Sequence, residues 1–260
     1  MITMAFKILS PEEAKKRAKA NVAEWEKQKE REEKREQKAK KEKKSGPALK
    51  SSSFDVKPNP SSLERSSLNS ELVEAINEGK VEIVRNLLDK GADANAKDKH
   101  GWPALVIAVI CETEIEIIEL LISKGASVVA RNESQEDALM HVAMSGDTDK
   151  AKLLIANGAD VLAFSSYGIT ALMYAAIQGH TKMVRLLISK GADMDHVDKD
   201  GRTALILAIE GDHDETARLL ISKGADVNAK KYPIKTALIA AEENENFKMV
   251  ELLKKNGAIG

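Results

Sequence analysis

Apolar clusters recur along residues 69–260 at a nearly constant spacing. Six Leu-Leu pairs are each followed, about four residues later, by a Gly-Ala pair. The Gly-Ala pairs begin at Gly91, Gly125, Gly158, Gly191, Gly224 and Gly257, so the intervals are 34, 33, 33, 33 and 33 residues. An Ala-Leu pair recurs earlier in five of these units, beginning at Ala104, Ala138, Ala171, Ala204 and Ala237. A period of this length indicates a repeat architecture in which each unit is one supersecondary element.

The unit over residues 198–230 shows what each repeat is expected to form. Its opening residues, 198–201, are a turn signal, and Thr203 can cap the helix that follows. Apolar residues at helical spacing predict a first helix with a small apolar face and a second helix that Gly224 ends. One such unit cannot bury its own apolar face, whereas stacked units can. The sequence therefore predicts an all-α solenoid of helix pairs joined by turns.

The motif over residues 173–193 carries a family resemblance. It reads Met-Tyr-Ala-Ala, then Gly-His, Leu-Leu and Gly-Ala-Asp, and this pattern resembles the ankyrin repeat. The resemblance implies a β-turn finger and two antiparallel helices in each repeat. Six repeats fit, at about 69–98, 99–132, 133–165, 166–198, 199–231 and 232–260. The first and the last have the character of caps.

Three departures from the family pattern lead to local expectations. Repeat two has one extra residue near Glu112, which predicts a looser turn between its helices. Repeat three has Gln135, and repeat six Ile234, where the turn glycine belongs, and Pro233 lacks the N–H that a turn uses. We therefore expect the fingers of repeats three and six to be irregular.

The resemblance also implies where a partner binds, because ankyrin proteins use the turn tips and the exposed side of each first helix. The corresponding partner-binding residues are Trp102, His100, Ile110, Glu136, Tyr167, Ile169, Ile177, Gln178, Arg202, Glu210, Tyr232 and Lys235. Aromatic and apolar residues among them are typical of interface hot spots, although Trp102 and Tyr232 could instead fold back onto their own hairpins. The acidic second half of this face favours a basic partner, and a solvated acidic face is the alternative.

The region before the repeats divides into three segments. Residues 1–10 form an apolar peptide with an extended docking pattern, and residues 11–44 predict a long charged helix with coiled-coil-like composition. Residues 45–68, rich in Ser and Pro, predict a flexible linker. The candidate docking residues are Ile2, Met4, Phe6, Ile8, Val22 and Trp25. A homo-oligomer through the helix is left open, but no heptad pattern continues beyond Trp25.

Composition and charge narrow the function classes. The chain has 260 residues, and aromatic residues make up only 3% of them. Its one cysteine, Cys111, excludes a disulfide framework, and we expect a buried or half-buried, inert thiol there. The five histidines show no metal-ligand spacing, no glycine-rich phosphate loop is present, and His180 and His213 are expected to be structural. No cofactor, metal, small-molecule substrate or catalytic residue is therefore expected, and the protein is interpreted as a non-enzyme.

Three hypotheses for the function remain open. The first is an adaptor or stoichiometric inhibitor that binds a protein partner on the concave face, with the N-terminal arm as a second contact. The second is self-masking, because residues 1–66 carry 18 basic and 11 acidic residues whereas residues 67–260 carry 22 and 30. The third, weaker because acids and bases alternate, is nucleic-acid binding by the Lys-rich helix. We expect a cytoplasmic protein without a membrane span, and leave nuclear location and secretion as an effector open.

Overall fold

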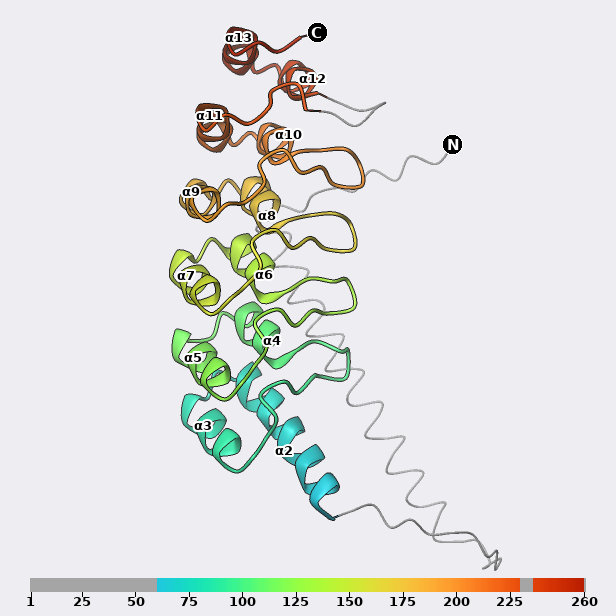
Figure 1. Ribbon diagram of the computed structural model, residues 1–260, viewed down its shortest axis with the longest axis vertical. Coiled ribbons are helices and arrows are strands. Elements are labelled where there is room, and N and C mark those ends of the chain that lie inside the picture. The colour runs from blue at the N-terminus through green and yellow to red at the C-terminus, as the bar shows by residue number, and fades with distance from the viewer. Residues whose placement is uncertain (1–59, 230–235, 260) are drawn as a thin grey trace, which may run out of the picture. The chain divides into compact units, whose positions relative to one another are not determined.

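The structure, a computed structural model, describes residues 60–229 and 236–259 and consists there of paired helices joined by turns. The first helix of each pair is followed at once by an antiparallel second helix (Figure 1). The helices are α2 (Pro60–Asn77), α3 (Val81–Asp89), α4 (Ala104–Ile110), α5 (Ile115–Ser123), α6 (Ala138–Ser145), α7 (Thr148–Ala156), α8 (Ala171–Ile177), α9 (Thr181–Ser189), α10 (Ala204–Glu210), α11 (Asp214–Ser222), α12 (Ala237–Glu243) and α13 (Phe247–Lys255).

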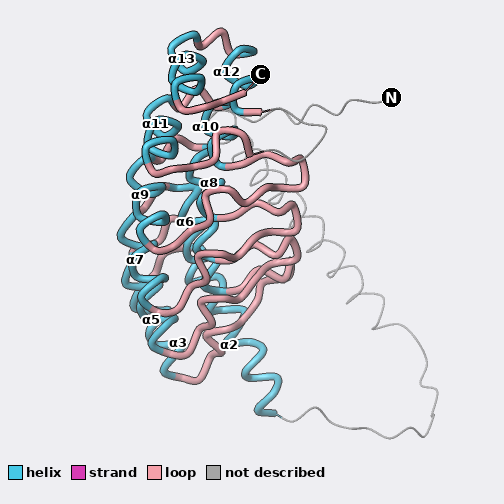
Figure 2. Tube along the Cα trace, turned by 45° about the horizontal axis from the view of Figure 1, so that its top comes forward, coloured by secondary structure: helices cyan, strands magenta, loops and turns pink. Residues whose placement is uncertain are grey.

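The pairs stack into two parallel columns of helices. Figure 1 shows α2, α4, α6, α8, α10 and α12 in one column and α3, α5, α7, α9, α11 and α13 in the other, and the loops project to one side. Figure 2 shows these loops as a row of fingers beside the even-numbered helices. Small residues, among them Ala108, Ala143, Ala175 and Ala208, are completely buried in the even-numbered helices, which lets successive helices approach closely. The predicted all-α solenoid is confirmed.

Helix α2 begins inside the segment that the sequence assigns to a flexible linker. That segment was expected to extend to residue 68, but residues 60–68 are helical. Pro60 is the first residue of the helix, a position where its fixed φ and missing N–H are favourable. Leu72 and Ile76 are fully buried against the stack, and a helix anchored in this way is extended at little further cost. The peptide over 1–10, the charged helix over 11–44 and the rest of the linker lie outside the described residues.

Each complete finger closes through the same backbone pattern. In the finger of repeat five, the N–H of Asp198 donates to the carbonyl of Arg202, and the N–H of Gly201 donates to the carbonyl of Asp198. Repeat three forms the equivalent bonds through Asn132, Gln135 and Glu136, and Gln135 has φ +60° where Gly201 has φ +79°. The expectation of an irregular finger in repeat three is therefore wrong: glutamine adopts the left-handed conformation because the finger's hydrogen bonds outweigh its cost. The finger of repeat six, at residues 232–235, lies outside the described residues.

Hydrogen bonds between neighbouring repeats hold the fingers' bases in register. The amide of Asn95 donates to the carbonyl of Gly125 and accepts from the N–H of Ser127, and Asn228 makes the same two bonds to Gly257 and Ile259. Asp195 keeps the accepting half, from the N–H of Asp226. Val129 and Leu162 occupy the same place in repeats two and three. An apolar side chain cannot make these bonds. This pair of side-chain hydrogen bonds to the next repeat, which we call the stitch, is therefore absent at Val129 and Leu162.

The turns between paired helices carry the expected structural histidines. The Nε2 atoms of His180 and His213 lie 3.0 and 2.9 Å from the carbonyl oxygens of Met144 and Ile177, one repeat back. The turn in repeat two has four residues, 111–114, against three in repeats four and five, in agreement with its extra residue. These bonds satisfy carbonyl groups that the end of a helix leaves without an intrahelical partner.

Candidate protein-binding face

Three contacts between fingers and helices define one continuous surface, which we call the inner face. The ring centroids of Trp102 and His141 lie 5.4 Å apart, and the Tyr174 hydroxyl donates to Oε1 of Glu136 at 2.6 Å. Further along the stack, Arg202 approaches Glu210 at 3.7 Å. In each contact, a residue at the end of a finger meets a side chain of an even-numbered helix. The inner face is therefore the surface that fingers two to five share with α4, α6, α8 and α10.

A hydrogen-bonded cluster forms the centre of the inner face. Besides the bond from Tyr174, the Glu136 carboxylate accepts from Nδ2 of Asn132 at 3.0 Å and lies 3.6 Å from Nε2 of His141. Burial lowers the pKa of His141, and the Glu136 carboxylate opposes this shift. Burial, and secondarily the bond to Glu136, raises the pKa of Tyr174. The cluster joins repeats three and four and holds Trp102 against its edge.

A row of exposed apolar side chains lies at the ends of the first three inner helices. Ile110 of α4 is 45% exposed and Met144 of α6 is 38% exposed, and Ile177 of α8 is half-buried. Tyr167 at the tip of finger four is 59% exposed. Large apolar side chains at successive equivalent positions are more than scattered surface residues, and such groupings mark interaction surfaces.

The same row becomes acidic toward the C-terminal repeats. Glu210 ends α10 and Glu243 ends α12 at the positions that Ile110, Met144 and Ile177 occupy earlier. Arg202 is the only cation among the candidate residues on the described part of this face, and its guanidinium meets Asp198 at 2.8 Å and Asp200 at 3.1 Å. The charge of Arg202 is thus used within the chain, on Asp198, Asp200 and Glu210.

The structure places the predicted binding residues unequally. His100, Ile110, Tyr167 and Gln178 are exposed, whereas Ile169 and Ile177 are half-buried against the core. Trp102 is half-buried and packs on His141 of the next repeat rather than onto its own hairpin. Tyr232, Lys235 and the N-terminal candidates Ile2, Met4, Phe6, Ile8, Val22 and Trp25 lie outside the described residues.

Two residues of the central cluster, His141 and Tyr174, are absent from the residues proposed from the sequence. Each lies three residues after the first residue of its helix, α6 or α8, about one helical turn from the finger. At the equivalent position α4 has Ile107 and α10 has Leu207. Two polar aromatic residues in adjacent repeats at a position that is otherwise aliphatic are the signal that could have found them.

Chemistry-bearing groups within the described ranges are few. No group of three or more His, Cys, Asp or Glu residues in residues 60–229 and 236–259 could hold a metal ion. Cys111, expected to be buried or half-buried, is an exposed residue at the end of α4, because the helix ends there. Its thiol donates to Oδ1 of Asn77 at 3.4 Å, and burial of the sulfur raises the pKa of the thiol. None of the helices in these ranges is long and apolar enough to cross a membrane.

Comparison with known families agrees with the geometry of the stack. The family model for ankyrin repeats matches residues 64–132, 139–231 and 191–259, which is more than half of the chain. No curated protein matches the chain. Ankyrin repeats generally serve as non-catalytic modules for protein–protein interaction. On this match and its helix-pair stack, the chain belongs to the ankyrin-repeat family.

Proposed function

We propose that this protein binds a protein partner along its inner face and acts as an adaptor or stoichiometric inhibitor. The observation that carries the proposal is a row of equivalent residues at or next to the ends of α4, α6, α8, α10 and α12, which is apolar at Ile110, Met144 and Ile177 and acidic at Glu210 and Glu243. A complementary partner presents an apolar strip followed by basic side chains. Such a partner would bury the exposed apolar area and complement the negative charge of the acidic residues.

The central cluster supports this proposal by fixing the shape of the surface in advance. The bonds that Glu136 receives from Tyr174 and Asn132 restrict side chains of two repeats before any partner arrives. Trp102, whose ring is tilted against that of His141, is restricted in the same way. A surface that is already ordered loses less conformational entropy on binding, and aromatic residues in such surroundings are frequent hot spots.

The N-terminal arm has two proposed roles that the charge distribution allows. As a second contact, it would recruit or tether a partner through its apolar residues Ile2, Met4, Phe6 and Ile8. As a mask, its basic helix would compete with a basic partner for the acidic end of the inner face. The second role predicts that raising the salt concentration increases partner binding by the full chain at first, because screening weakens the intramolecular contact.

Quantitative affinity capture from native extract tests the proposal with three full-length baits. These are the unaltered protein, a triple variant with Ile110→Ala, Met144→Ala and Tyr167→Ala, and a control with Lys182→Ala and Arg185→Ala on α9. All five side chains are exposed, so each variant should keep the thermal stability of the unaltered chain. We expect at least one protein to be retained by the unaltered bait and the control but lost from the inner-face variant. Retention by all three baits, or loss from the control alone, would contradict the proposal.

A further inference from the structure

A second exposed apolar group stands at the base of the fingers in the middle of the stack. Val129 is 48% exposed, Leu162 is 56% exposed and Phe164 is 53% exposed. Val129 and Leu162 replace the stitching residues that Asn95 and Asn228 represent elsewhere. At these two positions the chain lacks the hydrogen bonds between repeats and exposes aliphatic side chains to solvent. Neither feature stabilises the fold, so stability alone does not explain them.

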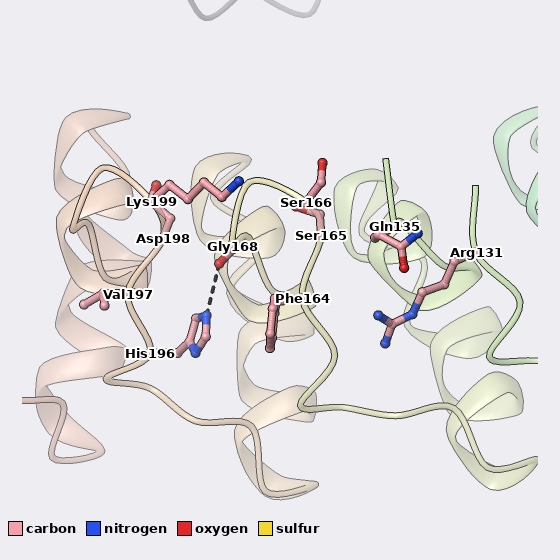
Figure 3. Close-up of a pocket in the computed structure, with 10 residues that line it drawn as sticks. All are labelled: Arg131, Gln135, Phe164, Ser165, Ser166, Gly168, His196, Val197, Asp198 and Lys199. Carbon is pink, nitrogen blue, oxygen red and sulfur yellow. Dashed lines mark hydrogen bonds between the residues drawn. The ribbon is translucent and has the colours of Figure 1, made fainter. Parts of the chain in front are cut away.

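Phe164 lines a hollow of about 350 Å³ between fingers three, four and five, which we call the outer pocket. Val129 and Leu162 stand two residues before its lining residues Arg131 and Phe164 along the chain. Arg131, Gln135, Phe164, His196 and Lys199 contribute its larger side chains (Figure 3). The ring of Phe164 stacks on His196, with centroids 5.4 Å apart and planes at 26°, and His196 is fixed by a 3.1 Å contact between Nε2 and the Gly168 carbonyl. In Figure 3 Phe164 stands between His196 on one side and Arg131 on the other. His196 thus covers one face of the aromatic ring, and residues on both sides of Phe164 line the pocket.

The outer pocket lies on the side of the fingers opposite to the inner face. Phe164 forms an isolated antiparallel bridge with Thr170, so these two side chains point to one side of finger four. Ile169, the neighbour of Thr170, points to the other side, since successive side chains on an extended segment alternate. Ile169 aligns with Trp102 and Glu136 of the inner face. A partner in the outer pocket therefore leaves the inner face free.

The charges of the outer pocket favour an acidic occupant. Neither Arg131 nor Lys199 forms a side-chain ion pair within residues 64–229 and 236–259. The one carboxylate of the pocket, Asp198, is buried and already bound by Arg202 at 2.8 Å. Two further aspartates, which precede Phe164 and His196 in sequence, are also engaged within the chain. Asp160 and Asp193 accept hydrogen bonds from the backbone N–H groups of Leu162 and Asp195. Two cations thus lie beside an aromatic ring, near two exposed aliphatic residues in sequence, and the charge of Arg131 also opposes the rise that burial causes in the pKa of Asp137.

We propose that the outer pocket and the adjoining Val129 and Leu162 form a second docking surface, which takes an extended acidic peptide segment of a protein partner. A carboxylate of that segment would pair with Arg131 or Lys199, and an adjacent apolar side chain would cover Phe164 and Leu162. The arrangement excludes the chain's own segment over residues 11–44 as the matching occupant, because that segment carries 14 basic and 9 acidic residues. Two partners, one on each side of the fingers, could then be held together.

The test measures binding of a short fluorescent peptide in which glutamates flank a phenylalanine–leucine pair, by anisotropy with the full chain. A second peptide has lysines in place of the glutamates. We expect the acidic peptide to bind and the basic one to bind at least about tenfold more weakly. The replacement Leu162→Asn restores the stitching residue, so it should weaken acidic-peptide binding by about tenfold while leaving the fold intact or stabilised. Arg131→Gln with Lys199→Gln should weaken it further.

The control is the inner-face variant with Ile110→Ala and Met144→Ala, which should bind the acidic peptide as the unaltered chain does. Absence of acidic-peptide binding, or equal binding of the two peptides, would overturn the proposal. So would an affinity that falls in the inner-face variant and is unchanged by Leu162→Asn, because the peptide would then occupy the inner face. If Leu162→Asn weakens peptide binding without lowering thermal stability, Leu162 acts in binding. If it lowers both, Leu162 has a structural role instead.

Discussion

The hydroxyl of Tyr174 donates a 2.6 Å hydrogen bond to Oε1 of Glu136 and so links the first helix of repeat four to the finger of repeat three. Both side chains are half-buried, and each comes from a different unit of the stack. In a solenoid, such a contact contributes to the coupling between neighbours rather than to one repeat alone. The bond thereby connects the stability of the stack to the order of its proposed binding surface.

Replacing Tyr174 by Phe should lower the free energy of unfolding by about 1–2 kcal/mol, since the bond has a charged acceptor. Chemical denaturation of the full chain measures the change. Tyr167→Phe is the matched control, because that ring is 59% exposed at a fingertip, and it should change the midpoint very little. Equal stability of the Tyr174→Phe variant and the unaltered chain would show that the bond adds nothing to the coupling.

Stability should also fall on the alkaline side because of Tyr174. Burial raises the pKa of this hydroxyl above its ordinary value near 10, so the unfolded chain loses the proton at a lower pH than the folded chain does. Below about pH 10 both states hold the proton, and above it the free energy of unfolding declines as the pH rises. Denaturation at a series of pH values from about 9 to about 11 should show a shallower decline for Tyr174→Phe. Parallel curves would contradict this assignment.

Gln135 offers a stabilising substitution. It has φ +60° at a position where Gly101, Gly168 and Gly201 have φ between +77° and +79°. Gln135→Gly should therefore stabilise the chain by about 0.5–1 kcal/mol, as the left-handed conformation costs glycine little. In the reverse test, Gly168→Ala should destabilise, because the added Cβ would lie 3.1 Å from Cα of Asp198. A rise in melting temperature for the first variant and a fall for the second is the expected pair of results, and a fall for both would refute the interpretation of the finger.

The stitch between repeats can be removed at one position and introduced at another, with opposite expected effects on the free energy of unfolding. Asn95→Leu removes the bonds to Gly125 and Ser127 and should cost about 1 kcal/mol, whereas Leu162→Asn should gain up to a similar amount by forming the equivalent bonds between repeats three and four. Thermal melts of the two variants test this directly. If Leu162→Asn were as destabilising as Asn95→Leu, the exposed leucine would have a packing role that its 56% exposure does not suggest.

Much of the fold follows from local rules that the sequence displays. The 33-residue period locates every helix pair, and Thr170, Thr203 and Thr236 cap α8, α10 and α12 as their positions predict. The start of α2 was missed because Pro and Ser occur in linkers and at helix starts alike. The regular finger of repeat three was missed because the cost of one left-handed glutamine is smaller than the sum of the finger's hydrogen bonds.

The candidate surfaces could be predicted less completely, since they depend on contacts between repeats. The exposure of Ile110 and Tyr167 agrees with the family position of these residues. The bond between Tyr174 and Glu136 joins two residues that are 38 positions apart in neighbouring repeats, and no local sequence pattern predicts that they meet. The sequence shows that Val129 and Leu162 stand where other repeats have Asn95 and Asn228. Only the structure shows that the asparagines bond to the next repeat and that the apolar residues lack these hydrogen bonds.

The central claim, that a protein partner occupies the inner face, is tested most directly by site-specific photocross-linking in native extract. A photoreactive phenylalanine analogue is placed at Met144 on the inner face or at Arg185 on the opposite helix column, each in the full chain. If a protein partner occupies the inner face, a discrete adduct forms with the probe at position 144 and is absent with the probe at position 185. An adduct that forms only from position 185 would contradict it.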